Sequence, residues 1–194
     1  VNTMLDSASK FQLSVDYHSE VMAGPMTKSY IGLNIQPGPD RYYMLQLVDD
    51  PKGAFERVDS SQAINGGTAT NTSTQTVHKN QFKISAQFAK TFYDFTIRAG
   101  IFESSGGAAL DYTLLNKKLR LSSEIFNFAR AEGPYMRAFA RYKFYSVFYA
   151  AAGGDDILNT KGNPLTGSGA SGFIGAGLDF NNDDLKLLLT RVPF

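Results

Sequence analysis

Apolar and polar side chains alternate with a period of two along most of this chain, and this alternation constrains the fold more than any other feature. In residues 82–88 the apolar side chains hold the even positions, and in residues 93–99 they hold the odd positions. Successive side chains of a β-strand point to opposite faces, so each segment would present one apolar face and one face carrying charges such as Lys83 and Arg98. Segments of about ten residues with this pattern, separated by short turns, are typical of outer-membrane β-barrels.

The pattern predicts an all-β fold, a transmembrane antiparallel β-barrel of about twelve strands. Residues 1–10 would form a lead-in segment and residues 11–194 the barrel. Eleven strands are clear, and a twelfth near residues 54–61 would pair with the strand before it. Bacterial barrels have even strand numbers, which favours twelve. The polar stretch 66–76 is predicted to be a hairpin or loop, and the Gly- and Asn-rich stretch 153–172 a long loop.

This strand count creates one topological tension. With twelve strands and both termini in the periplasm, the long segments 62–75 and 155–171 would lie on the periplasmic side. Barrels usually keep short turns there. Either these segments contact a periplasmic partner or the strand count is off by one.

Composition excludes several other classes of protein. Hydrophobic residues make up 43% of the chain and charged residues 19%, below the roughly 25% charged residues of soluble domains. A net charge of +1 gives no basic patch for nucleic acid. The absence of cysteine excludes disulfides, thiolate metal sites and cysteine nucleophiles. No apolar run is long enough for a transmembrane helix, and the first residues lack a signal peptide, which predicts a mature protein or a C-terminal fragment.

Parity assigns the two faces of the predicted wall. A charge on the lipid face would cost about 2 to 4 kcal/mol at the bilayer midplane, whereas charges of both signs can pair inside a hydrated lumen. A water-soluble barrel with its charged face outward is the alternative. The predicted lipid-facing set is Leu13, Val15, Ile31, Leu33, Leu45, Leu47, Ile84, Phe88, Phe95, Ile97, Leu121, Ala138, Ala140, Leu178 and Leu187. The predicted polar network of the lumen is Asp16, Lys83, Asp94, Arg98, Asp111, Arg120, Glu124, Arg137, Arg141, Asp179 and Lys186, together with Lys143.

The C-terminus carries a second barrel signature. Phe194 is the last residue and Val192 precedes it by two positions. An aromatic C-terminus with an apolar residue at this spacing is expected to be a signal for the barrel-assembly machinery of the bacterial outer membrane. Pro193 departs from a regular last strand, and a bulge or a frayed end would accommodate it.

The polar residues suggest no catalytic, cofactor-binding or metal-binding site, and the chain is predicted not to be an enzyme. His18 lies near Asp16 and Glu20 and would need a serine partner to act as a hydrolase base, so it is interpreted as a polar lumen residue. Adjacent aspartates at 49–50, 155–156 and 183–184 are interpreted as solvated turns, because neighbours on an extended chain point apart and cannot share a calcium ion. The lumen charges would form either a paired network that fills the lumen or a polar path for solutes or lipid head groups.

Several stretches together resemble one family, namely residues 11–20, 37–43, 47–53, 85–90, 101–107, 175–178 and 183–186. They resemble the C-terminal barrel region that follows the lipid-binding domain in some mammalian-cell-entry (MCE) lipid-transport proteins of diderm bacteria. The resemblance implies a barrel at the outer-membrane end of an intermembrane phospholipid-transport system. The implied partners are outer-membrane lipids, periplasmic and inner-membrane transport components, and further copies of the chain held together by an upstream domain.

The MCE domain itself is not in this sequence, so no ring assembly or lipid-binding residue is carried over. The alternative function is a free-standing outer-membrane porin or channel for small solutes, which a polar lumen would equally permit.

Overall fold

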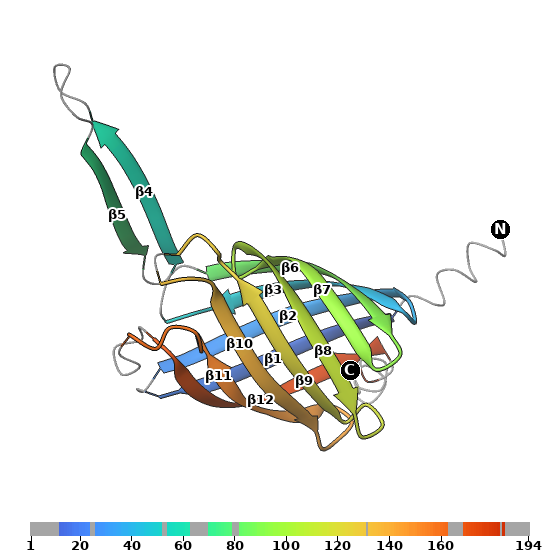
Figure 1. Ribbon diagram of the computed structural model, residues 1–194. Helices are drawn as coiled ribbons and strands as arrows, with labels where there is room; N and C mark the ends of the chain where they lie inside the picture. The colour runs from blue at the N-terminus through green and yellow to red at the C-terminus, as the bar shows by residue number, and fades with distance from the viewer. Residues whose placement is uncertain are drawn as a thin grey trace, which may run out of the picture.

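Ten antiparallel strands close into a barrel (Figure 1). The computed structural model describes residues 12–23, 26–51, 54–62, 70–78, 82–130, 132–162, 169–182 and 184, and it gives only the backbone path for 54–62 and 70–78. The strands of the wall are β1 (Gln12–Met22), β2 (Met26–Gly38), β3 (Arg41–Asp49), β6 (Phe82–Phe92), β7 (Phe95–Phe102), β8 (Ser105–Leu114), β9 (Leu119–Phe126), β10 (Tyr135–Lys143), β11 (Phe148–Asp155) and β12 (Ser171–Asn181). Each strand pairs with its neighbours, and β12 pairs with β1 to close the wall.

The remaining two described strands stand outside the wall. β4 (Ala54–Gln62) and β5 (Thr70–His78) pair only with each other and project from one end of the barrel (Figure 1). β3 pairs directly with β6, with Asp49 opposite Phe82. The predictions of about twelve barrel strands, and of a strand near residue 54 paired with the one before it, were therefore wrong. The two hairpin strands are polar at most positions and lack an apolar face that could line the outside of the wall.

The connections differ between the two ends of the barrel. The end from which β4 and β5 project, called the hairpin end, also holds the long connections 127–134 and 156–170. The opposite end, called the mouth end, is where β1 begins and β12 ends, and its strands are joined by short turns such as Pro39–Asp40. With ten strands, the β4–β5 hairpin and the connection 156–170 lie at the end of the barrel opposite to the start of β1 and the end of β12, whereas the twelve-strand prediction placed both long segments at the same end as the termini. The predicted loop 153–172 is shorter than expected because β11 continues to Asp155.

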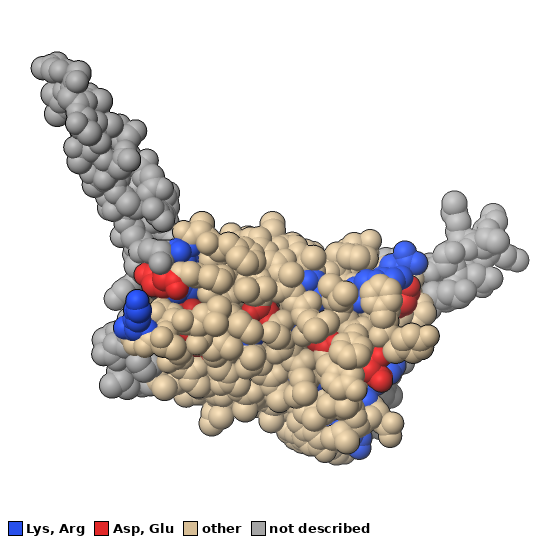
Figure 2. Space-filling model, viewed as in Figure 1, with Lys and Arg blue, Asp and Glu red and all other residues tan. Residues whose placement is uncertain are grey.

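The outer face of the wall is apolar along every strand. Tyr17 lies opposite Ile31, Ile31 opposite Leu47, and Leu47 opposite Ile84, and all four side chains are exposed. Figure 2 shows a wall that is mostly free of charge between its ends. The outward face of β6 spans ten residue steps, ~33 Å along the strand and ~25 Å along the axis of a barrel with the usual strand tilt.

The predicted lipid-facing residues lie on this outer face. The exposed members are Leu13, Ile31, Leu45, Leu47, Ile84, Phe88, Phe95, Ile97 and Leu121, and the half-buried members are Val15, Leu33, Ala138, Ala140 and Leu178. Leu187 lies outside the described residues. The charged outward positions Arg41, Asp49 and Lys90 occur only near strand ends.

Aromatic side chains gather on the outer surface near the mouth end. Ring contacts join neighbouring strands or the two sides of a turn, namely Tyr43 with Phe88, Phe95 with Tyr112, and Phe144 with Phe148, at centroid distances of 5.4, 4.6 and 6.4 Å. Aromatic girdles of this kind border the apolar band of membrane barrels.

Candidate functional site

The interior of the barrel is filled at the hairpin end by buried charges. Lys28 is fully buried, with its Nζ 2.6 Å from Glu103 Oε1 and 3.2 Å from Asp50 Oδ2. Lys83 contacts the same Asp50 oxygen at 2.6 Å. We call this cluster the plug; its charged members are Glu20, Lys28, Asp50, Lys83, Glu103, Arg137 and Asp155, and its aromatic members are Phe102, Phe126 and Tyr135.

Arg137 joins the charges of the plug across the barrel. Its Nη2 donates to Glu20 Oε2 at 2.6 Å, and its Nε lies 2.9 Å from Asp155 Oδ1. The Tyr135 hydroxyl donates to the same aspartate, and the Tyr135 ring stacks on Phe126, which stacks on Phe102. Buried charges are stable only when partners replace the lost water, and these contacts provide such partners.

Arg98 forms the boundary of the plug on the mouth side. Its Nε and Nη2 donate to the two oxygens of Asp111 at 2.9 and 2.8 Å, and Nη2 also donates to Glu124 at 2.8 Å. Nη1 donates to Gln87 at 2.7 Å. All three nitrogens of the guanidinium therefore donate hydrogen bonds, which fixes the side chain against β8 and β9.

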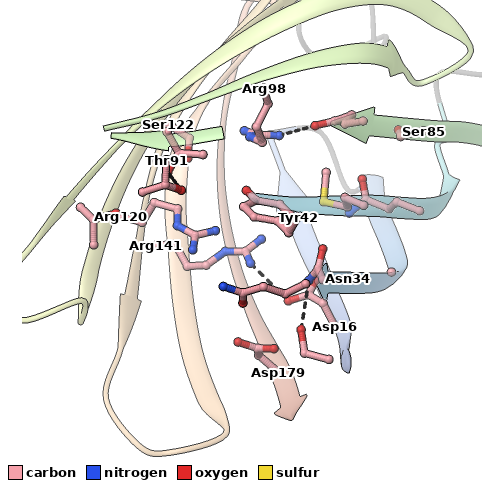
Figure 3. Close-up of a pocket in the computed structure, with 18 of the residues that line it drawn as sticks. Asp16, Asn34, Tyr42, Ser85, Thr91, Arg98, Arg120, Ser122, Arg141 and Asp179 are labelled. Carbon is pink, nitrogen blue, oxygen red and sulfur yellow. Dashed lines mark hydrogen bonds and ion pairs between the residues drawn. The ribbon is translucent and has the colours of Figure 1, made fainter. Parts of the chain in front are cut away.

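Between the plug and the mouth end lies a cavity of about 610 Å³ (Figure 3). Its floor includes Tyr30, Phe102 and Glu103 of the plug region, and its lining reaches Asp40 and Asn181 at the mouth end. Most of the lining residues carry an amide, a hydroxyl or a charged group, although apolar atoms also form a substantial part of the surface. The volume lies in the range of small-molecule binding sites.

Asp16 organises one side of the cavity. Its Oδ1 lies 2.7 Å from His18 Nδ1, and its Oδ2 accepts a 2.6 Å bond from the Tyr149 hydroxyl and a 3.2 Å bond from Arg141 Nη1. The His18 ring stacks on Tyr30 with centroids 4.2 Å apart. Gly177 makes room for this group, because a Cβ there would lie 2.4 Å from the Tyr149 ring. His18 Nε2 faces Glu20 at 3.7 Å, so the histidine lies between two carboxylates.

The predicted lumen residues differ in exposure. Asp16, Lys83, Arg98, Asp111, Glu124 and Arg137 are buried inside the barrel, and all of these except Lys83 and Asp111 also border the cavity. Arg120, Arg141, Lys143 and Asp179 line the cavity, while Asp94 lies in the exposed turn after β6 at its mouth. Lys186 and the predicted assembly signal Val192 and Phe194 lie outside the described residues.

Sequence reasoning missed much of the plug. Two of the aspartate pairs were interpreted as solvated turns, and this was wrong: Asp50 and Asp155 are 1% and 0% exposed, and Asp156 forms a two-bond pair with Arg130. Asp50 and Asp155 keep the inward parity of β3 and β11. Extending the parity of β3 by one position would have found Asp50, and Glu20 has the parity of Asp16, but residues 146–152 are apolar on both faces and gave no parity from which to place Asp155. No group of three or more His, Asp or Glu that could hold a metal ion occurs in the part of the chain that the structure describes.

Comparisons with known proteins identify relatives of undetermined role. A family model described as a lipocalin-like domain matches residues 13–187. An uncharacterized protein of Aquifex aeolicus (strain VF5) is 30% identical over 193 residues, which is 93% of this chain and 54% of that protein. The chain therefore spans about half the length of this relative.

Among solved structures, this chain is similar to the siderophore receptor PirA from Acinetobacter baumannii, with 14% sequence identity. The match covers 81% of this chain and 32% of the receptor chain. Its TM-score of 0.29 is too low to support an argument about fold or function.

Proposed function

Because this chain belongs to a family of lipocalin-like domains, we propose that its barrel receives a small polar group in the cavity, and that it does so as a membrane-spanning protein. Specifically, the barrel forms the outer-membrane end of an intermembrane phospholipid-transport system, and the cavity receives the lipid head group. The supporting arguments concern the outer wall, the cavity and the relatives.

The observation that carries the proposal is the polarity of the wall, which is apolar outside and charged inside. Exposed side chains such as Ile31, Leu47 and Ile84 form a continuous outer surface, while Arg98 and Arg137 face inward. A water-soluble barrel of this composition would be expected to turn the charged face outward. In a bilayer the same arrangement is favourable, since lipid covers the apolar band and the charges pair within the lumen. No helix of the described residues is long and apolar enough to cross a membrane.

The lining of the cavity favours a head group over acyl chains. Asn34, Gln46 and Gln87 supply amides, and Arg120 and Arg141 supply guanidiniums. Burying an acyl chain against such groups would remove their water without replacing its hydrogen bonds, which is unfavourable. The acyl chains of a bound lipid would therefore stay in the apolar part of the membrane or in a partner protein.

The place in lipid transport is proposed from the resemblance to the barrel regions of MCE proteins. The Aquifex relative is compatible with it, because that protein is long enough to contain a further segment of comparable size. The cavity also opens at the end where β1 begins, so a segment preceding the barrel would join it beside the mouth. If both termini are periplasmic, the mouth faces the periplasmic and inner-membrane components of such a system.

The plug argues against the alternative of a free-standing channel. Lys28, Asp50 and Asp155 are at most 1% exposed, so side chains fill the cross-section at the hairpin end. Planar-bilayer recordings of the purified barrel should show little or no steady conductance. A large, steady conductance, with unchanged lipid asymmetry in a deletion strain, would favour the channel.

Photo-crosslinking tests the proposal directly, using two adjacent residues of β3. Tyr42 lines the cavity and Tyr43 lies on the outer face. A benzophenone side chain in place of Tyr42 should form an adduct with phospholipid in cells, and one in place of Tyr43 should label bulk membrane lipid. Labelling at Tyr43 with none at Tyr42 would show that head groups do not enter the cavity. Labelling at neither position would contradict membrane insertion.

A further inference from the structure

Two arginines stand directly opposite each other on the inner wall of the cavity. Arg120 of β9 is the register partner of Arg141 of β10, and both side chains line the cavity drawn in Figure 3. Arginine stays protonated in proteins, and like charges directly opposite on neighbouring strands destabilise a sheet. The fold of an empty barrel gains nothing from this arrangement.

Arg141 is only partly engaged by its neighbours. It lies over the Tyr149 ring at 4.2 Å and donates one 3.2 Å bond to Asp16, but its Nε has no hydrogen-bond partner among the residues that the structure describes. Asp16 already has the shorter contacts to His18 and Tyr149. The 3.2 Å contact of Arg141 is the longest of the three that Asp16 makes.

Arg120 is less engaged than Arg141. It forms no hydrogen bond or ion pair with any residue that the structure describes, and it is exposed to the cavity. The deeper arginines have more carboxylate contacts, since Arg98 and Arg137 each lie within 2.9 Å of two carboxylates and Arg141 within 3.2 Å of one. The unused positive charge among the cavity arginines is thus concentrated on the Arg120–Arg141 pair.

We propose that Arg120 and Arg141 form a binding site for a phosphate oxyanion, the group shared by phospholipid head groups and inorganic phosphate. The planar fork of a guanidinium matches phosphate oxygens with two parallel bonds, and two adjacent forks can hold one phosphate from two sides. The bound anion offsets the repulsion between the arginines and supplies the acceptors that they lack. This proposal rests on the proposed function and names the chemistry that the cavity recognises.

The test measures binding of inorganic phosphate and of a short-chain phosphatidylglycerol to the purified barrel in non-ionic detergent, by phosphorus NMR line broadening. Arg120→Gln should weaken binding of both probes by roughly tenfold or more, as expected when one charged hydrogen-bonding group is lost. Arg120→Lys should recover part of the affinity, because it restores the charge without the fork. Equal affinity of the two probes would identify free phosphate as the ligand, and tighter binding of the lipid would identify the head group.

A matched control and a second readout keep the test independent of folding. Arg41→Gln makes the same charge change on an exposed outer side chain that does not line the cavity, and it should leave binding unchanged. Without phosphate, Arg120→Gln should unfold in urea at the same concentration as the wild type or higher. Phosphate should stabilise the wild type more than the variant.

Equal phosphate binding by Arg120→Gln and the wild type would overturn the proposal, as would an equal loss in Arg41→Gln. In either case, lipid labelling at Tyr42 would still support the proposed function. Failure of the arginine site can therefore be distinguished from failure of the proposed function.

Discussion

The plug and the cavity are built on the same strands from the same kinds of side chain. Side chains fill the interior of the barrel in the plug, whereas the cavity leaves space inside it. In the plug, each lysine and arginine contacts at least one carboxylate, and Phe102, Phe126 and Tyr135 fill the remaining space. In the cavity, Arg120 has no ion-pair partner among the residues that the structure describes, and Arg141 has a single carboxylate contact, at 3.2 Å to Asp16. The difference indicates that charge pairing, rather than charge itself, separates the structural part of a polar lumen from the part available to a ligand.

The strongest test of this comparison removes one arginine from each region. Arg137→Ala would leave Glu20 and Asp155 buried with one contact fewer each, at a cost of about 3 to 5 kcal/mol. Arg120→Ala should leave the free energy of unfolding nearly unchanged. Urea unfolding in detergent, followed by loss of the gel shift of the folded barrel, measures both. Equal destabilisation by the two variants would show that pairing does not distinguish the regions.

A second test compares the outer wall with the cavity at adjacent positions of β7. Ile97 is exposed on the outer face, and an arginine there should reduce insertion, because the cost of such a charge is about 2 to 4 kcal/mol at the bilayer midplane and falls towards the interfaces. Thr96 lines the cavity, which has room for a longer side chain, so Thr96→Arg should insert normally. The yield of folded protein in purified outer membranes is the measurement. If both variants insert equally well, the assignment of the two faces is wrong.

A smaller effect is expected from filling the space that keeps the cavity cluster in place. Gly177→Ala would push Tyr149 away from Asp16 and should destabilise the barrel by about 1 to 3 kcal/mol. Gly106→Ala is the control, because nothing lies within 4 Å of its added Cβ. Unfolding midpoints compare the two variants. A neutral Gly177→Ala would mean that Tyr149 has alternative positions.

The smallest effect is expected at the rim, where an ion pair stands in solvent. A hydrogen bond from Lys90 holds the pKa of Asp40 below its usual value. A depressed carboxyl pKa contributes stability above the pKa of the unfolded state and loses it as pH falls through the folded value, so any contribution would vanish only in strong acid. NMR titration should show the Asp40 pKa rising towards its usual value in Lys90→Met, with no measurable loss of stability at pH 7. A clear loss of stability in Lys90→Met at pH 7 would show that this exposed ion pair stabilises the barrel as much as a buried one.

The sequence predicted the wall well because period two is a local property. The exposed positions of Ile84 and Ile97 and the inward positions of Arg98 and Arg137 all follow from parity. The plug was largely missed because its contacts join distant parts of the chain. Lys28 and Glu103 are 75 residues apart, and Glu20 and Arg137 are 117 apart. No local pattern shows which of the inward charges will meet.

The strand count failed for a related reason. Residues 54–62 would join the wall only if they paired with β3, but β3 pairs with β6, which begins after the hairpin. The strand count therefore depends on a contact between segments that are distant in the sequence. The sequence left open whether the lumen charges fill the lumen as a paired network or line a polar path. A cavity exists only where side chains, including the aromatic ones of the plug, no longer fill the interior, and the sequence does not show where that is. Its arginine pair required the register of β9 against β10.

The projecting hairpin has a consequence for the order in which the barrel folds. Residues 50–81 separate the register partners Asp49 and Phe82, and closing so long a segment is entropically unfavourable. Once Ala54 pairs with His78, only residues 50–53 and 79–81 remain to be closed, which reduces the closure cost by about 1 kcal/mol. Early zipping of β4 onto β5 would therefore speed the docking of β6 onto β3, an effect on folding rate that requires no contact between the hairpin and the finished wall.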